Sequence, residues 1–279
     1  MTYPSILVPL DNQPECITRT ATVLKLARAM GSHVTGVAPM EVLDLRATLA
    51  TASSVASLPI LGRDVLVADA TRAALAFDIA CELAGVASRQ ALVDESDMST
   101  ALNQRARVND LVVLTQSDPR DGRHQAFGNR QIETTLLASA RPVLVLPYAS
   151  AGQTLGERVL VAWDDSHAAA RALADALPLL RRAAHVQVLA FNKPEASDEG
   201  GFSDDLASLR EWLQRQGVQA QTRVETTEIS IADALLSRAS DLDIDLIVMG
   251  AFGHSRWRLL GGATRAILAS MTVPVLLSH

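Results

Sequence analysis

The chain has 279 residues, of which 48% are hydrophobic and 20% charged, as is typical of a globular protein. Its net charge of −6 argues against non-specific binding to nucleic acid, because phosphate contacts need clustered Lys and Arg side chains. Its apolar runs are shorter than the roughly 18 residues of a membrane span, and we expect no signal peptide. The two cysteines form neither a CxxC motif nor a metal-ligand spacing, so we expect a reduced, cytoplasmic protein.

Each half of the sequence begins with a short strand that is apolar on both faces and is followed by an aspartate, Asp11 or Asp164. Ser166 is a suitable N-cap for the next helix of the second half. The helices and second strands predicted after these aspartates are Glu15–Met30, His33–Ala38, His167–Ala184 and His185–Phe191. Strand and helix then alternate to the end of each half, which predicts an α/β fold with parallel sheets covered by helices on both faces.

Three apolar segments of the first half recur in the same order in the second half. The matched pairs are residues 5–11 with 158–164, 110–114 with 245–249, and 141–146 with 273–277. A repeat of about 140 residues is long enough for a core in each copy. We therefore predict two tandem, doubly wound, parallel five-stranded sheets of Rossmann-like type, in domains 1–148 and 156–279, with a short linker at Tyr148–Glu157.

The first half is longer than the second between two matched strands. Leu7 and Leu111 lie 104 positions apart, whereas Leu160 and Leu246 lie 86 apart, a difference of 18. We expect the additional residues within Met40–Asp69, as a surface loop with a helical piece.

The last strand of each half, Val143–Leu146 or Val275–Leu277, is expected at a sheet edge, after Pro142 or Pro274. Exposed apolar edges favour association. We predict that these strands pair with each other, so that the halves form an intramolecular pseudo-dimer; the chain then acts alone or as a homodimer.

A glycine-rich motif occurs only in the second half, directly after the strand at 245–249. It reads MGAFGHSRWRLLGGATR over Met249–Arg265, and the last helix is predicted at about Thr264–Ser270. Glycine lets the backbone approach a phosphate, and a helix N-terminus offers free amides to an anion. Ligands of doubly wound sheets bind at the carboxyl ends of strands. A simple turn would also explain the motif.

Together with the duplication and the two aspartates, this motif resembles the tandem form of the universal stress protein family over essentially the entire chain. Nucleotide-binding members of that family carry Gly-x2-Gly-x9-Gly-[Ser/Thr] after the fourth strand. Gly250 and Gly253 match the first pair, but only seven residues separate Gly253 from Gly261. Aligning Gly261–Thr264 with the closing segment therefore requires a two-residue deletion. The resemblance implies an adenine nucleotide alpha hydrolase-like fold in each half.

The resemblance also implies that the second half binds ATP or another adenine nucleotide, with or without Mg²⁺. Adenine would lie against Asp164 and the backbone of Ala190 or Phe191. The residues implied near the phosphates are Gly250, Gly253, His254, Arg256, Gly262, Ala263 and Thr264. Simpler roles stay open, because Asp164 also suits a helix cap, Trp163 suits packing and Arg256 suits a solvated face.

The equivalent loop of the first half, Thr115–Gly128, lacks the paired glycines. It places Asp118 and Asp121 where a phosphate would lie, and like charges repel each other. We expect this half to be structural.

The sequence contains no P-loop, GxGxxG, GxSxG or HExxH motif, so we predict no catalytic residue and no protein metal site. The leading hypothesis is a non-catalytic, cytoplasmic stress-response protein that binds an adenine nucleotide as a regulatory ligand and acts on a protein partner of unknown identity. One alternative is a partner-binding scaffold that has lost nucleotide binding, since the glycine loop is shortened. Another is a weak ATPase, in which Asp164 and Asp165 hold a metal with the nucleotide.

Overall fold

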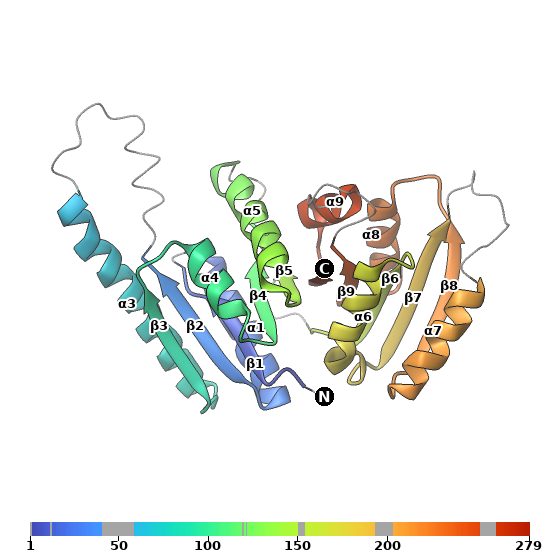
Figure 1. The fold of residues 1–279 in the computed structure, drawn as a ribbon, viewed down its shortest axis with the longest axis horizontal. Helices are drawn as coiled ribbons and strands as arrows, with labels where there is room; N and C mark the ends of the chain where they lie inside the picture. The colour runs from blue at the N-terminus through green and yellow to red at the C-terminus, as the bar shows by residue number, and fades with distance from the viewer. Residues whose placement is uncertain are drawn as a thin grey trace. The chain divides into compact units, whose positions relative to one another are not determined.

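A computed structural model of the chain describes residues 2–11, 13–40, 59–118, 120, 122–149, 154–192, 203–251 and 261–279 (Figure 1). Contacts divide these residues into two compact units, Tyr3–Leu114 and Thr115–His279, and Thr2 groups with the latter. Of the helices in the described ranges, none combines the length and the apolar character needed to cross a bilayer.

The first unit is built around parallel strands in the order β3-β2-β1-β4. Its elements are β1 (Ser5–Pro9), α1 (Glu15–Met30), β2 (His33–Pro39), α3 (Pro59–Leu83), β3 (Arg89–Asp94), α4 (Met98–Ala106) and β4 (Leu111–Thr115). The prediction of a helix at Glu15–Met30 is confirmed. This helix stops where Gly31 adopts a φ of 71°, the left-handed conformation that commonly terminates helices.

The helix α3 packs closely on β2 because position 36 is a glycine. A Cβ atom at Gly36 would lie 2.9 Å from Cε1 of Phe77, a buried residue of α3. Residues 59–69, expected in a surface loop with a helical piece, are the first turns of this long helix. The rest of that expected loop, residues 41–58, lies outside the described residues.

The second unit has the strand order β5-β10-β9-β6-β7-β8. Its elements are α5 (Gly122–Ser139), β5 (Val143–Leu146), β6 (Arg158–Trp163), α6 (His167–Leu180), β7 (His185–Asn192), α7 (Ser203–Arg215), β8 (Ala220–Thr226), α8 (Ile231–Asp241), β9 (Leu246–Gly250), α9 (Gly262–Ser270) and β10 (Val275–Ser278). Neighbouring strands run parallel, except that β5 and β10 are antiparallel with Val145 opposite Val275. The predicted pairing of the two last strands is therefore confirmed.

The two repeats share one topology, because the order β8-β7-β6-β9 in the second repeat matches β3-β2-β1-β4 in the first. The predicted doubly wound α/β fold is confirmed. The compact units do not follow the sequence repeat, since β5 pairs with β10 and so groups with the second repeat. Domain limits at 1–148 and 156–279 remain a prediction from the repeat.

Candidate functional site at the carboxyl edge of the second repeat

Two predicted site residues lie at the same sheet edge, on neighbouring strands. The strands β6 and β9 pair in parallel, with Val161 opposite Val248. Asp164 directly follows β6, and Gly250 is the last residue of β9. Strand order reverses between β6 and β9, and doubly wound sheets bind their ligands at such a switch point.

Asp164 helps to shape the turn between β6 and α6 while its side chain stays exposed. Its Oδ1 accepts a hydrogen bond from the Ser166 amide at 3.1 Å. The Ser166 hydroxyl in turn accepts from the Ala169 amide at 3.1 Å, which confirms Ser166 as the N-cap of α6. Within the described residues no cation pairs with Asp164, so its carboxylate is available to a ligand as well as to the turn.

Ala190 lies near the end of β7, opposite Trp163 of β6. Its side chain is fully buried. Only its backbone could therefore contact a ligand, as the family resemblance implied. Phe191, the other residue named for this role, follows it and lies opposite Glu225 of β8.

Gly250 is required by packing even without a ligand. A Cβ atom at this position would lie 2.7 Å from the backbone nitrogen of Ala169 and 2.8 Å from Cβ of Ala168. Both alanines belong to the first turn of α6. The glycine thus lets α6 begin directly against β9, a role that the sequence motif did not predict.

The start of α9 offers backbone amides without a side-chain cap. Its N-cap residue, Gly261, makes no capping hydrogen bond, and a Cβ atom at Gly262 would meet no atom within 4 Å. The first helical hydrogen bond runs from the Arg265 amide to the Gly261 carbonyl, so the preceding amides have no intrahelical acceptor. Ala263 and the amide of Thr264 belong to this turn. An uncapped helix N-terminus of this kind is suited to an anion.

The side chain of Thr264 has a structural role. Its hydroxyl donates a hydrogen bond to the Ala251 carbonyl at 2.8 Å, and the residue is buried. Because Ala251 directly follows β9, this bond holds the first turn of α9 at the edge that carries Asp164. Three further predicted site residues, Gly253, His254 and Arg256, lie outside the described residues, and their roles remain predictions.

The aspartate of the first repeat differs from Asp164 because it is neutralised internally. Arg19 of α1 donates to Asp11 Oδ2 at 2.7 Å and to the Pro9 carbonyl at 2.9 Å, and it is only 3% exposed. The corresponding position of α6, eight residues after Asp164, is the buried Ala172. Sequence reasoning missed Arg19. The sequence does contain a signal for this residue, because a charged side chain lies within the apolar face of a predicted helix.

The loop after β4 also pairs its own charges. Arg120 donates to both carboxylate oxygens of Asp118, at 2.7 to 3.1 Å, and these bonds hold the pKa of Asp118 below its usual value. The guanidinium of Arg120 lies over the Tyr148 ring, 5.7 Å from its centroid. The first repeat therefore pairs its own charges at this position, whereas the second repeat has amides at the start of α9 that bond to no described acceptor. Asp121 lies outside the described residues.

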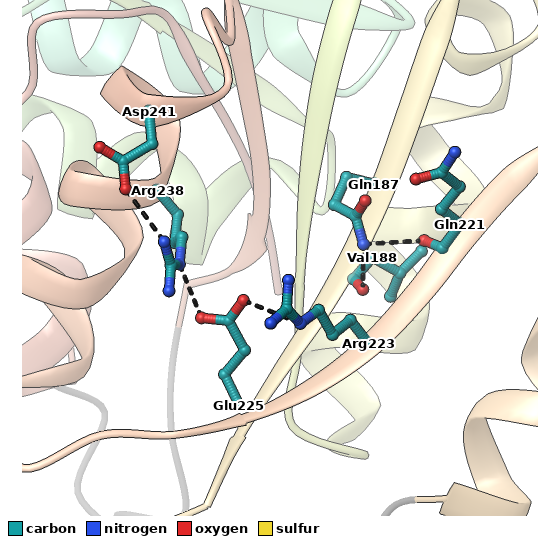
Figure 2. Close-up of polar contacts among 7 residues, drawn as sticks. All are labelled: Gln187, Val188, Gln221, Arg223, Glu225, Arg238 and Asp241. Carbon is teal, nitrogen blue, oxygen red and sulfur yellow. Dashed lines mark hydrogen bonds and ion pairs between the residues drawn. The ribbon is translucent and has the colours of Figure 1, made fainter.

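A second polar cluster, at β8 and α8, proves to be internally balanced (Figure 2). Glu225 accepts from Arg238 at 2.7 Å and lies 3.3 Å from Arg223, while Arg238 also donates to Asp241 at 3.0 Å. Two guanidinium groups meet two carboxylates, so this cluster fastens β8 to α8 and offers no spare cation. No trio of His, Cys, Asp or Glu side chains within the described ranges is placed to hold a metal ion.

Residues 156–279 match the sequence model of the universal stress protein family. The chain is similar in fold to a universal stress protein from Archaeoglobus fulgidus DSM 4304, with 16% identity, a TM-score of 0.75 and coverage of 98% of this chain and 95% of that one. A functionally unknown protein from Pseudomonas aeruginosa PAO1 aligns with 17% identity and a TM-score of 0.65, covering 99% and 92% of the two chains. A universal stress protein in complex with cAMP aligns with 21% identity, a TM-score of 0.34, and 44% and 97% coverage. A search of curated proteins found no match.

Proposed function

Residues 156–279 belong to the universal stress protein family, and from this premise we propose that the second repeat binds an adenine nucleotide as a regulatory ligand. The protein would act in a stress response without turning the nucleotide over. The observation that carries the proposal is the uncapped start of α9, held at the end of β9 by the bond from Thr264 to Ala251. Phosphates would bind there, because the amides of that turn have no acceptor among the described residues.

The remaining parts of the nucleotide would bind along the same sheet edge. Asp164 would accept hydrogen bonds from the adenosine moiety, since no described cation occupies its carboxylate. The backbone at Ala190 would border the adenine ring. Because no described group of side chains is arranged as a metal site, Mg²⁺ would be bound mainly by the phosphates and water.

The contrast between the repeats supports one nucleotide per chain. The first repeat neutralises Asp11 with the buried Arg19 and lacks the glycine pair after β4. A nucleotide would have to displace a partly buried ion pair there, whereas the second repeat needs no such rearrangement.

Two alternatives each rest on a specific observation. The scaffold hypothesis rests on the seven-residue spacing between Gly253 and Gly261, which shortens the loop that would surround the phosphates. The weak ATPase hypothesis rests on the consecutive carboxylates of Asp164 and Asp165 at the same sheet edge.

Calorimetric titration of the full chain with ATP, ADP, AMP and cAMP tests the proposal. We expect one equivalent of at least one of these nucleotides. Gly253→Asp should weaken its binding at least tenfold, or roughly 1.4 kcal/mol, by adding a side chain and a negative charge. The matched change in the first repeat, Ser117→Asp, should leave the affinity unchanged.

Other results would support different conclusions. Two equivalents per chain, or equal losses in both variants, would contradict the assigned asymmetry. An absence of binding by the wild-type chain would favour the scaffold. Phosphate release from ATP that is lost in Asp164→Ala would favour the ATPase.

A further inference from the structure

The outer face of α3 is apolar and exposed. The inner face of this helix packs on the sheet through Ala70, Ala74, Phe77 and Cys81. On the opposite face, Leu75 is 60% exposed, Ile79 49% and Leu83 84%. The spacing of four residues aligns these three side chains along one stripe of the helix, and no described residue covers them.

The fold itself does not require an apolar outer face on this helix. The corresponding helix of the second repeat is α7, which likewise lies between the second and third strands. Among its described side chains, no large hydrophobic residue is exposed. Its exposed surface carries charges instead, including an ion pair between Glu211 and Arg215. The apolar stripe is thus particular to α3.

Charged residues on either side of the first two stripe residues indicate what can cover the stripe. Arg72 precedes Leu75 by three residues, and Glu82 follows Ile79 by three. With the four residues between Leu75 and Ile79, this spacing is the pattern of a coiled-coil seam. From residue 72 to residue 82, this face therefore presents a cation, two apolar side chains and an anion, and Leu83 directly follows the anion. When two such helices pack antiparallel, each cation faces an anion and each apolar side chain faces an apolar side chain. The stripe is therefore self-complementary.

Both charges are largely exposed, with side-chain exposures of 72% for Arg72 and 76% for Glu82. Arg72 has an intrahelical partner in Asp69 at 2.8 Å, and Glu82 lies 3.9 Å from Arg89. Exposed ion pairs of this kind are weak and readily exchange partners. Another acidic residue close to the stripe, Asp78, forms an ion pair with Arg89 at 2.7 Å. Glu82 is therefore the anion that the stripe can offer to a partner.

We infer that a second copy of this chain packs on α3 with its own α3 antiparallel, as a two-fold symmetric dimer. In this arrangement Arg72 faces Glu82 of the second copy, and Leu75 faces Ile79. A parallel arrangement would instead place like charges together. Burial of the apolar side chains supplies the affinity, while the charges determine the orientation. The inference is independent of nucleotide binding.

Sedimentation velocity of the full chain over a concentration series tests the inference by charge exchange. The wild-type chain should form dimers at micromolar concentrations. Arg72→Glu or Glu82→Arg alone should weaken the dimer by about tenfold or more, because each creates two repulsive contacts across the two-fold axis. The double exchange R72E/E82R should restore dimerisation, since it re-forms both opposite-charge contacts in reverse.

A matched control lies on α7, where the exchange E211R/R215E should leave the dimer unchanged. Leu75→Asp should give a monomer with the circular dichroism spectrum and the urea-unfolding midpoint of the wild type, which separates loss of the interface from misfolding. A wild-type chain that stays monomeric at about 100 µM would overturn the inference. A dimer insensitive to the single variants, or one that the double exchange does not restore, would overturn it as well.

Discussion

The Gln116 side chain donates a hydrogen bond from Nε2 to the backbone carbonyl of Leu268, 2.8 Å away, in the last turns of α9. Gln116 is buried and follows β4, whereas Ala251 takes the corresponding position after β9. The backbone amides of both residues donate to the end of the last strand of their own repeat, which establishes the correspondence. The helix α9 is therefore held near its start by Thr264 and near its end by a residue of the first repeat.

Gln116→Leu should destabilise the protein by about 1 to 3 kcal/mol, because it leaves the buried Leu268 carbonyl without its donor. Urea unfolding measures the loss. Thr134→Ala, which removes an exposed hydroxyl bond within α5, should change the free energy of unfolding by about 0.5 kcal/mol or less. Equal losses of unfolding free energy in the two variants would show that the bond to α9 stabilises the protein no more than an exposed helix bond.

Gly250 and Gly262 should respond differently to substitution by alanine. Gly250→Ala should lower the free energy of unfolding by about 1 to 3 kcal/mol, since the added Cβ meets the backbone of α6 at 2.7 Å. Gly262→Ala meets open space and restricts the unfolded chain, so it should be neutral or stabilise by up to about 1 kcal/mol. Thermal and urea denaturation of both variants decides this. A stable Gly250→Ala protein would contradict the packing role.

Removing only one partner of the ion pair between Asp11 and Arg19 should lower the free energy of unfolding more than replacing both. Asp11→Asn leaves the buried guanidinium without its carboxylate and should destabilise the protein by about 1 to 3 kcal/mol. The double variant D11N/R19M replaces the cation with an apolar side chain and should recover much of that loss. The check is a double-mutant cycle by chemical denaturation, and simple additivity would show that the pair is uncoupled.

Burial raises the pKa of the Cys81 thiol from 9.0 to about 11. The unfolded chain therefore releases this proton at lower pH than the folded protein, and the thiol's contribution to stability, full below about pH 9, is lost as pH rises toward 11. The loss should reach roughly 2 to 3 kcal/mol. Urea unfolding between pH 8 and 11 should show a shallower decline in Cys81→Ala than in the wild type. Parallel pH profiles would contradict the assignment.

Much of the fold could be predicted because its elements are determined by local patterns. The helix at Glu15–Met30 and the strand at Val143–Leu146 have the predicted limits. The pairing of the last strands followed from their apolar edges. The bounds were less exact where a local pattern was ambiguous: the helical piece expected within Met40–Asp69 is the start of α3, at residues 59–69, and α9 begins at Gly262, two residues before the approximate start at Thr264.

The candidate site was less predictable because its geometry depends on contacts between distant residues. The position of Asp164 and Gly250 at the same sheet edge could be inferred from the topology of parallel strands. The clash that a side chain at Gly250 would make with α6 could not, since it depends on how closely that helix packs. Arg19 was missed for the same reason, because its partner becomes evident only when α1 is placed on β1.

The antiparallel pairing of β5 with β10 also bears on how the two copies could diverge after a gene duplication. As long as the first copy supplies β5 and Gln116, its loop after β4 can lose the glycines without uncovering β10. Selection would then act on a strand in one copy and on the proposed ligand-binding edge in the other. A shortened gene encoding only residues 156–279 would need a new partner strand before its product could persist.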